Sequence, residues 1–73
     1  MNELKALLEE MYPNIDFDKE KNLYDDGIID SVHVVTIIAR IEEAFDIAVT
    51  MEYIQPSYFQ SVDTMWEMVE ELM

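Results

Sequence analysis

The strongest helical pattern in this sequence is DSVHVVTIIARIEEAF, residues 30–45. Its apolar residues recur at the three- and four-residue spacing of one helix face, namely Val34, Ile37, Ile38, Ile41 and Phe45. Asp30 and Ser31 stand at its start, where Asp and Ser are favoured capping residues. A strand over residues 32–38 is the competing interpretation, but the pattern does not alternate. We therefore expect a helix from about Asp30 or Ser31 to Phe45.

Two further helical patterns flank this stretch. The first is expected to end near Met11, because Pro13 disfavours helix at Tyr12, and its apolar face is Leu4, Leu7, Leu8 and Met11. The second is expected to be capped by Ser61, and its apolar face is Val62, Met65, Trp66, Val69, Leu72 and Met73. Between the last two helices, one turn is expected from Thr50 to Ile54 and another from Pro56 to Phe59.

Residues 13–30 show no sustained period and contain Gly27, the one glycine of the chain. A loop of this length is unusual in a compact domain and is often functional. Its apolar residues predict that it packs against the core; they are Ile15, Phe17, Leu23, Ile28 and Ile29. The chain is therefore expected to be all-α: an up-and-down bundle of three long helices and one short one, forming a single domain over residues 1–73.

Composition and charge exclude several classes of function. The 73 residues suffice for one small domain, and the absence of cysteine excludes disulfides, thiolate metal sites and thiol nucleophiles. Seventeen Asp and Glu against four Lys and Arg give a net charge of −13. This charge disfavours nucleic acids and anionic membranes as partners and favours basic protein surfaces. It also opposes self-association, so we expect a monomer whose stability increases with salt.

The sequence contains no membrane-spanning stretch, since none approaches about 20 apolar residues. The N-terminal residues lack the basic and apolar regions of a secretion signal. We therefore expect a cytoplasmic protein.

Neither catalysis nor metal binding is expected. The one histidine, His33, lies two residues after Ser31, and side chains at that spacing do not face each other on a helix. Acidic and amide residues alternate as in the start of a calcium loop, at Asp16, Asp18, Glu20 and Asn22. The calcium-loop pattern requires glycine at position six and glutamate at position twelve, where Lys21 and Gly27 stand. The sequence predicts no catalytic residue and no metal site.

Ser31 is the most informative polar residue. A serine in the first turn of a helix presents its hydroxyl beside backbone N–H groups that attract an anion. A phosphodiester on Ser31 would be accommodated there if the Asp30 carboxylate points away. The alternative is that Ser31 is only a capping or first-turn residue, and the residues by themselves leave both interpretations open.

The runs DDGIIDSV (residues 25–32) and IEEAFDI (residues 41–47) resemble the acyl carrier protein family, and the resemblance extends over nearly the whole chain. It implies that a separate transferase attaches 4′-phosphopantetheine from coenzyme A to Ser31, with Asp30 in the transferase recognition motif. The thiol of this arm would carry an acyl or aminoacyl group as a thioester. Partner enzymes would supply the chemistry, and this chain would not be an enzyme.

The resemblance also implies two contact regions. Val32 and Val35 would form an apolar patch for partners, and Glu42 and Glu43 would meet basic residues of loading ligases and synthases. An acyl chain could insert between the helices, with six candidate lining residues, each also explained as ordinary core: Val34, Ile37, Ile41, Val49, Phe59 and Met65.

The expected function is that of a stand-alone acyl carrier in fatty-acid, polyketide or related biosynthesis. One alternative is an aminoacyl carrier (D-alanyl or peptidyl) loaded by an adenylating ligase. Another is an unmodified acidic helical module for protein interaction. Four residues depart from the commoner family pattern: Val32, where leucine is commoner, His33 and Thr36, which stand where acids are frequent, and Thr50, which replaces a frequent proline. The segment over residues 56–62 is more similar to specialised carriers in aminoacyl or polyketide pathways. These departures argue against a housekeeping role in fatty-acid synthesis.

Overall fold

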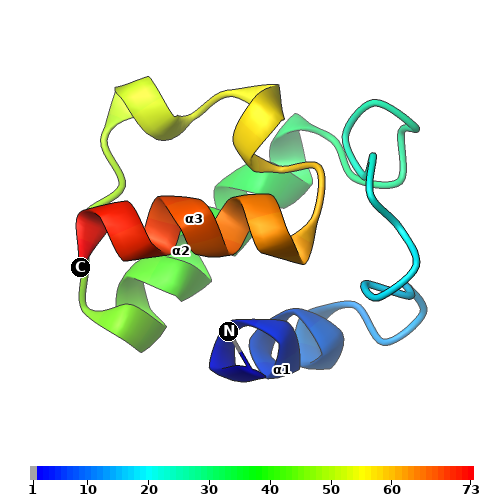
Figure 1. Cartoon of the computed structure of the whole chain (residues 1–73), viewed down its shortest axis with the longest axis horizontal. Helices are drawn as coiled ribbons and strands as arrows, with labels where there is room; N and C mark the ends of the chain where they lie inside the picture. Colours follow the sequence, from blue (N-terminus) through cyan, green and yellow to red (C-terminus); the bar gives the residue numbers. More distant parts are fainter. Residues whose placement is uncertain (1) are drawn as a thin grey trace.

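The computed structural model describes residues 2–73, which form three α-helices and two short 3₁₀ turns (Figure 1). The helices are α1 (Asn2–Met11), α2 (Ser31–Phe45) and α3 (Val62–Leu72). The 3₁₀ turns are η1 (Met51–Tyr53) and η2 (Pro56–Tyr58). No strand occurs within residues 2–73. The prediction of a small all-helical bundle is confirmed.

The short fourth helix of the prediction is not confirmed: between α2 and α3 the described chain has η1 and η2, at the places where the two turns were predicted. The residue between the two turns, Gln55, has extended backbone with φ −135° and ψ 147°. Pro56 follows it, lacks an N–H group and disfavours helical backbone at the preceding residue. A continuous helix across this segment is thereby prevented.

The helices do not alternate in direction along the chain, as the predicted up-and-down bundle requires. In Figure 1, α2 (green) and α3 (orange to red) both run from right to left, whereas α1 (blue) runs the opposite way. The connection through η1 and η2 returns the chain to the end of the bundle where α2 begins. There the backbone N–H of Leu23 donates to the Gln60 carbonyl at 2.8 Å.

The core lies where α1 packs against both α2 and α3. Fully buried side chains come from all three helices: Leu4, Leu8, Ile37, Ile41, Met65, Met68 and Val69. The long loop contributes Phe17, Leu23 and Ile29, so the prediction that it packs against the core is confirmed. Six residues of the predicted apolar helix faces lie further out: five are half-buried, namely Leu7, Met11, Phe45, Trp66 and Leu72, and Met73 is exposed. Phe45 and Trp66 contact each other edge-on with ring centroids 6.0 Å apart.

The predicted cap of the last helix is confirmed. The Ser61 hydroxyl accepts the backbone N–H of Thr64 at 3.2 Å, and the Thr64 hydroxyl accepts the backbone N–H of Ser61 at 3.1 Å. These reciprocal bonds satisfy donors that the first turn of a helix leaves free. They fix the start of α3 at Val62, two residues after Gln60, which contacts the loop before α2.

Candidate functional site

A tight turn leads into α2. The backbone N–H groups of Ile28 and Ile29 both donate to the Leu23 carbonyl, at 3.0 and 3.1 Å. Gly27 adopts a φ of +74°, a left-handed conformation that glycine takes without steric cost. Ile29 is then buried in the core, and Asp30 is placed at the start of α2.

Asp30 caps α2. Its backbone is extended, and its Oδ1 accepts the backbone N–H groups of Val32 and His33 at 3.0 and 3.1 Å. Of the two structural roles that the sequence allowed Ser31, the first-turn position is confirmed and the cap is wrong, because Asp30 is the cap and Ser31 is the first helical residue. The Asp30 carboxylate binds two of the N–H groups that were expected to attract an anion. Within residues 2–73, the Ser31 backbone N–H has no acceptor.

His33 completes this end of α2. Its Nδ1 lies 2.8 Å from Asp30 Oδ1 and 3.2 Å from the Asp30 backbone nitrogen. One ring nitrogen cannot donate and accept at once, and the shorter contact favours an Nδ1–H that donates to the carboxylate. The imidazole also contacts the ring of Tyr12, which follows α1, with centroids 5.2 Å apart. His33 thus links the cap of α2 to the end of α1.

These contacts affect two titrating groups. Hydrogen bonds from the His33 backbone, and next from its side chain, hold the pKa of the Asp30 carboxyl below its ordinary value. Partial burial raises the pKa of Tyr12, and the nearby Asp30 charge raises it further. Asp30 therefore stays ionised beside Ser31 at neutral pH.

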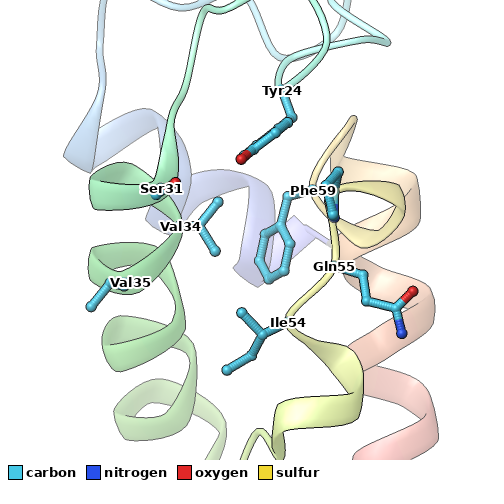
Figure 2. A pocket seen from close by; sticks show the side chains of 8 residues that line it. Tyr24, Ser31, Val34, Val35, Ile54, Gln55 and Phe59 are labelled. Atoms are coloured by element: carbon cyan, nitrogen blue, oxygen red, sulfur yellow. The ribbon is translucent and has the colours of Figure 1, made fainter.

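Ser31 itself is exposed, and its hydroxyl forms no hydrogen bond within residues 2–73. It lies at the edge of a pocket of about 210 Å³ between α2 and the η1–η2 segment (Figure 2). In Figure 2, Val34, Ile54 and Phe59 point into this pocket from three sides, and the Tyr24 hydroxyl points into it from the loop. The remaining lining residues are Val35, Gln55 and Pro56.

The apolar contact residues predicted from the sequence lie on the surface near Ser31. Val32 is 73% exposed and Val35 is 65% exposed. The sequence pattern missed two further exposed apolar residues, Met51 at 86% and Ile54 at 46%, because η1 has no helical period that would assign them to a face. Val35 and Ile54 both line the pocket, which places them at the same opening.

The two predicted acidic contacts differ. Glu43 is exposed on α2. Glu42 is half-buried, and its Oε2 accepts the backbone N–H of Val49 at 2.8 Å. Glu42 therefore holds the segment that leaves α2, in addition to any contact with a partner.

Two of the six residues predicted to line an acyl pocket, Val34 and Phe59, line the pocket beside Ser31. Ile37, Ile41 and Met65 are fully buried in the core. Val49 is half-buried near Glu42, away from the lining residues. In this conformation these four residues have the ordinary core and packing roles that the sequence also allowed.

Gln60 is a site residue that the sequence did not reveal. Its Oε1 accepts the backbone N–H groups of Tyr24 and Asp25, both at 3.1 Å, across separations of 36 and 35 residues. These bonds fix the loop that carries Tyr24 against the segment that carries Phe59. No local sequence pattern encodes a pairing of this range.

Within residues 2–73 there is no group of three or more His, Cys, Asp or Glu residues arranged to hold a metal ion. In the same part of the chain, no helix has both the length and the apolar composition needed to cross a membrane.

Comparison with known proteins gives one match. The model of a family described as phosphopantetheine attachment site matches residues 2–57, a range that contains α1, α2, the loop between them and Ser31. No curated protein and no solved structure matches the chain.

Proposed function

This chain belongs to the phosphopantetheine attachment site family, and we propose that Ser31 bears the 4′-phosphopantetheine prosthetic group of that family. The observation that carries this assignment is the state of Ser31. It is an exposed serine at the first position of α2, within the matched range, and its hydroxyl has no structural partner in the described chain. Asp30 rather than Ser31 caps α2, so the cap does not use the Ser31 hydroxyl.

One backbone donor of the first turn is left for a phosphodiester on Ser31. The Ser31 backbone N–H is the donor left free in the first turn, because the Asp30 carboxylate bonds to Val32 and His33. The same bonds hold the Asp30 charge against the helix end and beside the His33 ring. Asp30 is then presented, next to Ser31, as part of the surface that a transferase recognises.

Domains of this family work with a phosphopantetheinyl transferase and with partner enzymes, and they are generally not catalytic themselves. The bound group supplies a terminal thiol that carries cargo as a thioester. For this chain we assign the role of an acyl carrier in fatty-acid, polyketide or related biosynthesis. Val32, Val35 and Glu43 are the exposed residues that would contact loading and processing enzymes, with Glu43 attracting their basic residues.

Aminoacyl cargo is the second candidate, and the lack of space for a long alkyl chain in the described structure supports it. About 210 Å³ lies below the roughly 300–1,000 Å³ of pockets that enclose a drug-sized ligand. Three of the predicted acyl-pocket residues, Ile37, Ile41 and Met65, are fully buried and leave no exposed surface for a long alkyl chain. Short cargo, including an aminoacyl group from an adenylating ligase, therefore needs no rearrangement of the core.

The test is the intact mass of the protein after incubation with coenzyme A, magnesium and a broad-specificity phosphopantetheinyl transferase. We expect a gain of one phosphopantetheine, no gain for Ser31→Ala, and an undiminished gain for Ser57→Ala, which replaces another exposed serine. A folded parent protein that gains no mass beside an active control carrier contradicts the assignment. An unmodified acidic interaction module would then be the better description.

A further inference from the structure

The Tyr24 hydroxyl is a polar group directed into a mainly apolar pocket. It points between Val34 and Phe59 toward the side where Ser31 lies (Figure 2). It forms no hydrogen bond within residues 2–73, whereas the other long polar side chain of the lining, Gln55, donates to the Glu52 carbonyl at 2.6 Å. A free hydroxyl in an apolar pocket is suited to a ligand that combines apolar and polar atoms.

The position of Tyr24 is fixed from outside the pocket. Its backbone N–H donates to Gln60 Oε1 at 3.1 Å, and the adjacent Asp25 N–H donates to the same oxygen. Phe59, the neighbour of Gln60 in the chain, is fully buried and lines the pocket. The backbone that carries the Tyr24 side chain is therefore held in place before any ligand binds, which lowers the cost of ordering this loop on binding.

We infer that this pocket binds the pantoyl segment of the arm, and that the Tyr24 hydroxyl donates a hydrogen bond to it. The inference rests on the proposed attachment at Ser31. The pantoyl segment directly follows the phosphate and carries two methyl groups on one carbon, then a hydroxyl, then an amide carbonyl. The methyl groups match Val34, Ile54 and Phe59, and the hydroxyl or carbonyl matches Tyr24.

Two observations favour this segment over the cargo. Ser31 lies at the edge of the pocket, so the atoms next to the phosphate reach the lining without any reversal of the arm. Cargo at the far end would have to fold back along the whole arm. The volume of about 210 Å³ also suits one segment of the arm better than the arm together with an acyl chain.

The experiment compares apo and holo protein by NMR, with the conversion verified by intact mass. In holo protein we expect nuclear Overhauser effects between the geminal methyl groups and Val34, Ile54 or Phe59. Tyr24→Phe removes the hydroxyl and keeps the ring, and we expect it to lower the docking equilibrium constant about two- to tenfold, the effect of one hydrogen bond. Tyr53→Phe is the matched control, since Tyr53 is half-buried in η1 and does not line the pocket.

If the protein gains no mass, the proposed attachment at Ser31 is wrong. This result differs from that of a protein which gains the mass but whose arm does not dock in the pocket. The inference is overturned if the holo protein shows no nuclear Overhauser effects between the geminal methyl groups of the arm and the pocket residues. It is also overturned if the pocket responds only when an acyl group is loaded, because the cargo is then its occupant. Identical docking in Tyr24→Phe and the parent protein overturns the role of Tyr24.

Discussion

Asp30 Oδ1 lies 2.8 Å from His33 Nδ1 and also accepts the His33 backbone N–H at 3.1 Å, so contacts between these two residues cap the N-terminus of α2. Ser31 lies between them in the chain and takes no part in these bonds. The consequence is a helix start that is capped without using the serine. The Ser31 hydroxyl is therefore available to a modifying enzyme at no cost to the fold.

The Asp30 cap predicts a specific pH dependence. The folded-state pKa of Asp30 is held below its ordinary value of 3.8, so its contribution to stability is present above that pH and is lost as the pH falls through the lowered pKa. Asp30→Asn abolishes this titration. The difference in Tm between parent and Asp30→Asn, measured by circular dichroism from about pH 6 to about pH 3, should therefore shrink on acidification.

His33 is expected to stabilise the fold through both its nitrogen and its ring. His33→Ala removes the bond to Asp30 and the contact with Tyr12, and should lower the free energy of unfolding by about 1–2 kcal/mol. His33→Phe keeps an aromatic ring against Tyr12 and should recover about half of that loss. Urea unfolding followed by circular dichroism measures both values. Equal losses in the two variants contradict a contribution from the ring contact.

Local patterns predicted the parts of this fold that depend on neighbours in the sequence. The three helices and the Ser61 cap follow from apolar spacing and capping residues, and the structure has them where expected. The choice between Asp30 and Ser31 as the cap was not predictable from residue type, because both are favoured and the His33 bond decides it. Glu42 was expected only at the surface, since nothing in its own helix indicates the later Val49 N–H that it accepts.

Gln60 is expected to hold the loop before α2 in place. Gln60→Ala leaves the N–H groups of Tyr24 and Asp25 without their acceptor, and should lower the free energy of unfolding by about 1–3 kcal/mol. Hydrogen exchange of these two amides should accelerate relative to the rest of the chain. Gln60→Glu retains an acceptor oxygen and should protect both amides. Unchanged exchange of Tyr24 and Asp25 in Gln60→Ala rules out this role.

Variants of Glu42 and Glu43 test the contributions of these two neighbours to folding and to partner binding separately. Glu42→Ala removes the acceptor of the Val49 N–H and should lower the free energy of unfolding by about 1 kcal/mol. Glu43→Ala replaces an exposed side chain and should leave stability within about 0.5 kcal/mol. Glu43→Ala should instead slow association with a loading ligase that has a basic surface, at low salt, as measured by stopped flow. An unchanged association rate for Glu43→Ala excludes it as a partner contact.

Salt is expected to raise the Tm, because the net charge of −13 is confined to a molecule of 26 × 22 × 19 Å. The four Lys and Arg residues offset little of this charge: Lys5 and Lys21 pair with Asp18 and Asp63, at 2.6 and 3.5 Å. At about 0.01 M ionic strength the screening length of about 30 Å exceeds these dimensions, whereas at about 0.15 M it falls to about 8 Å. Repulsion across the molecule is therefore present in the first condition and largely screened in the second. Thermal scans in sodium chloride should show the increase over this range, and a Tm that stays constant shows that the acidic residues are too well solvated to destabilise the fold.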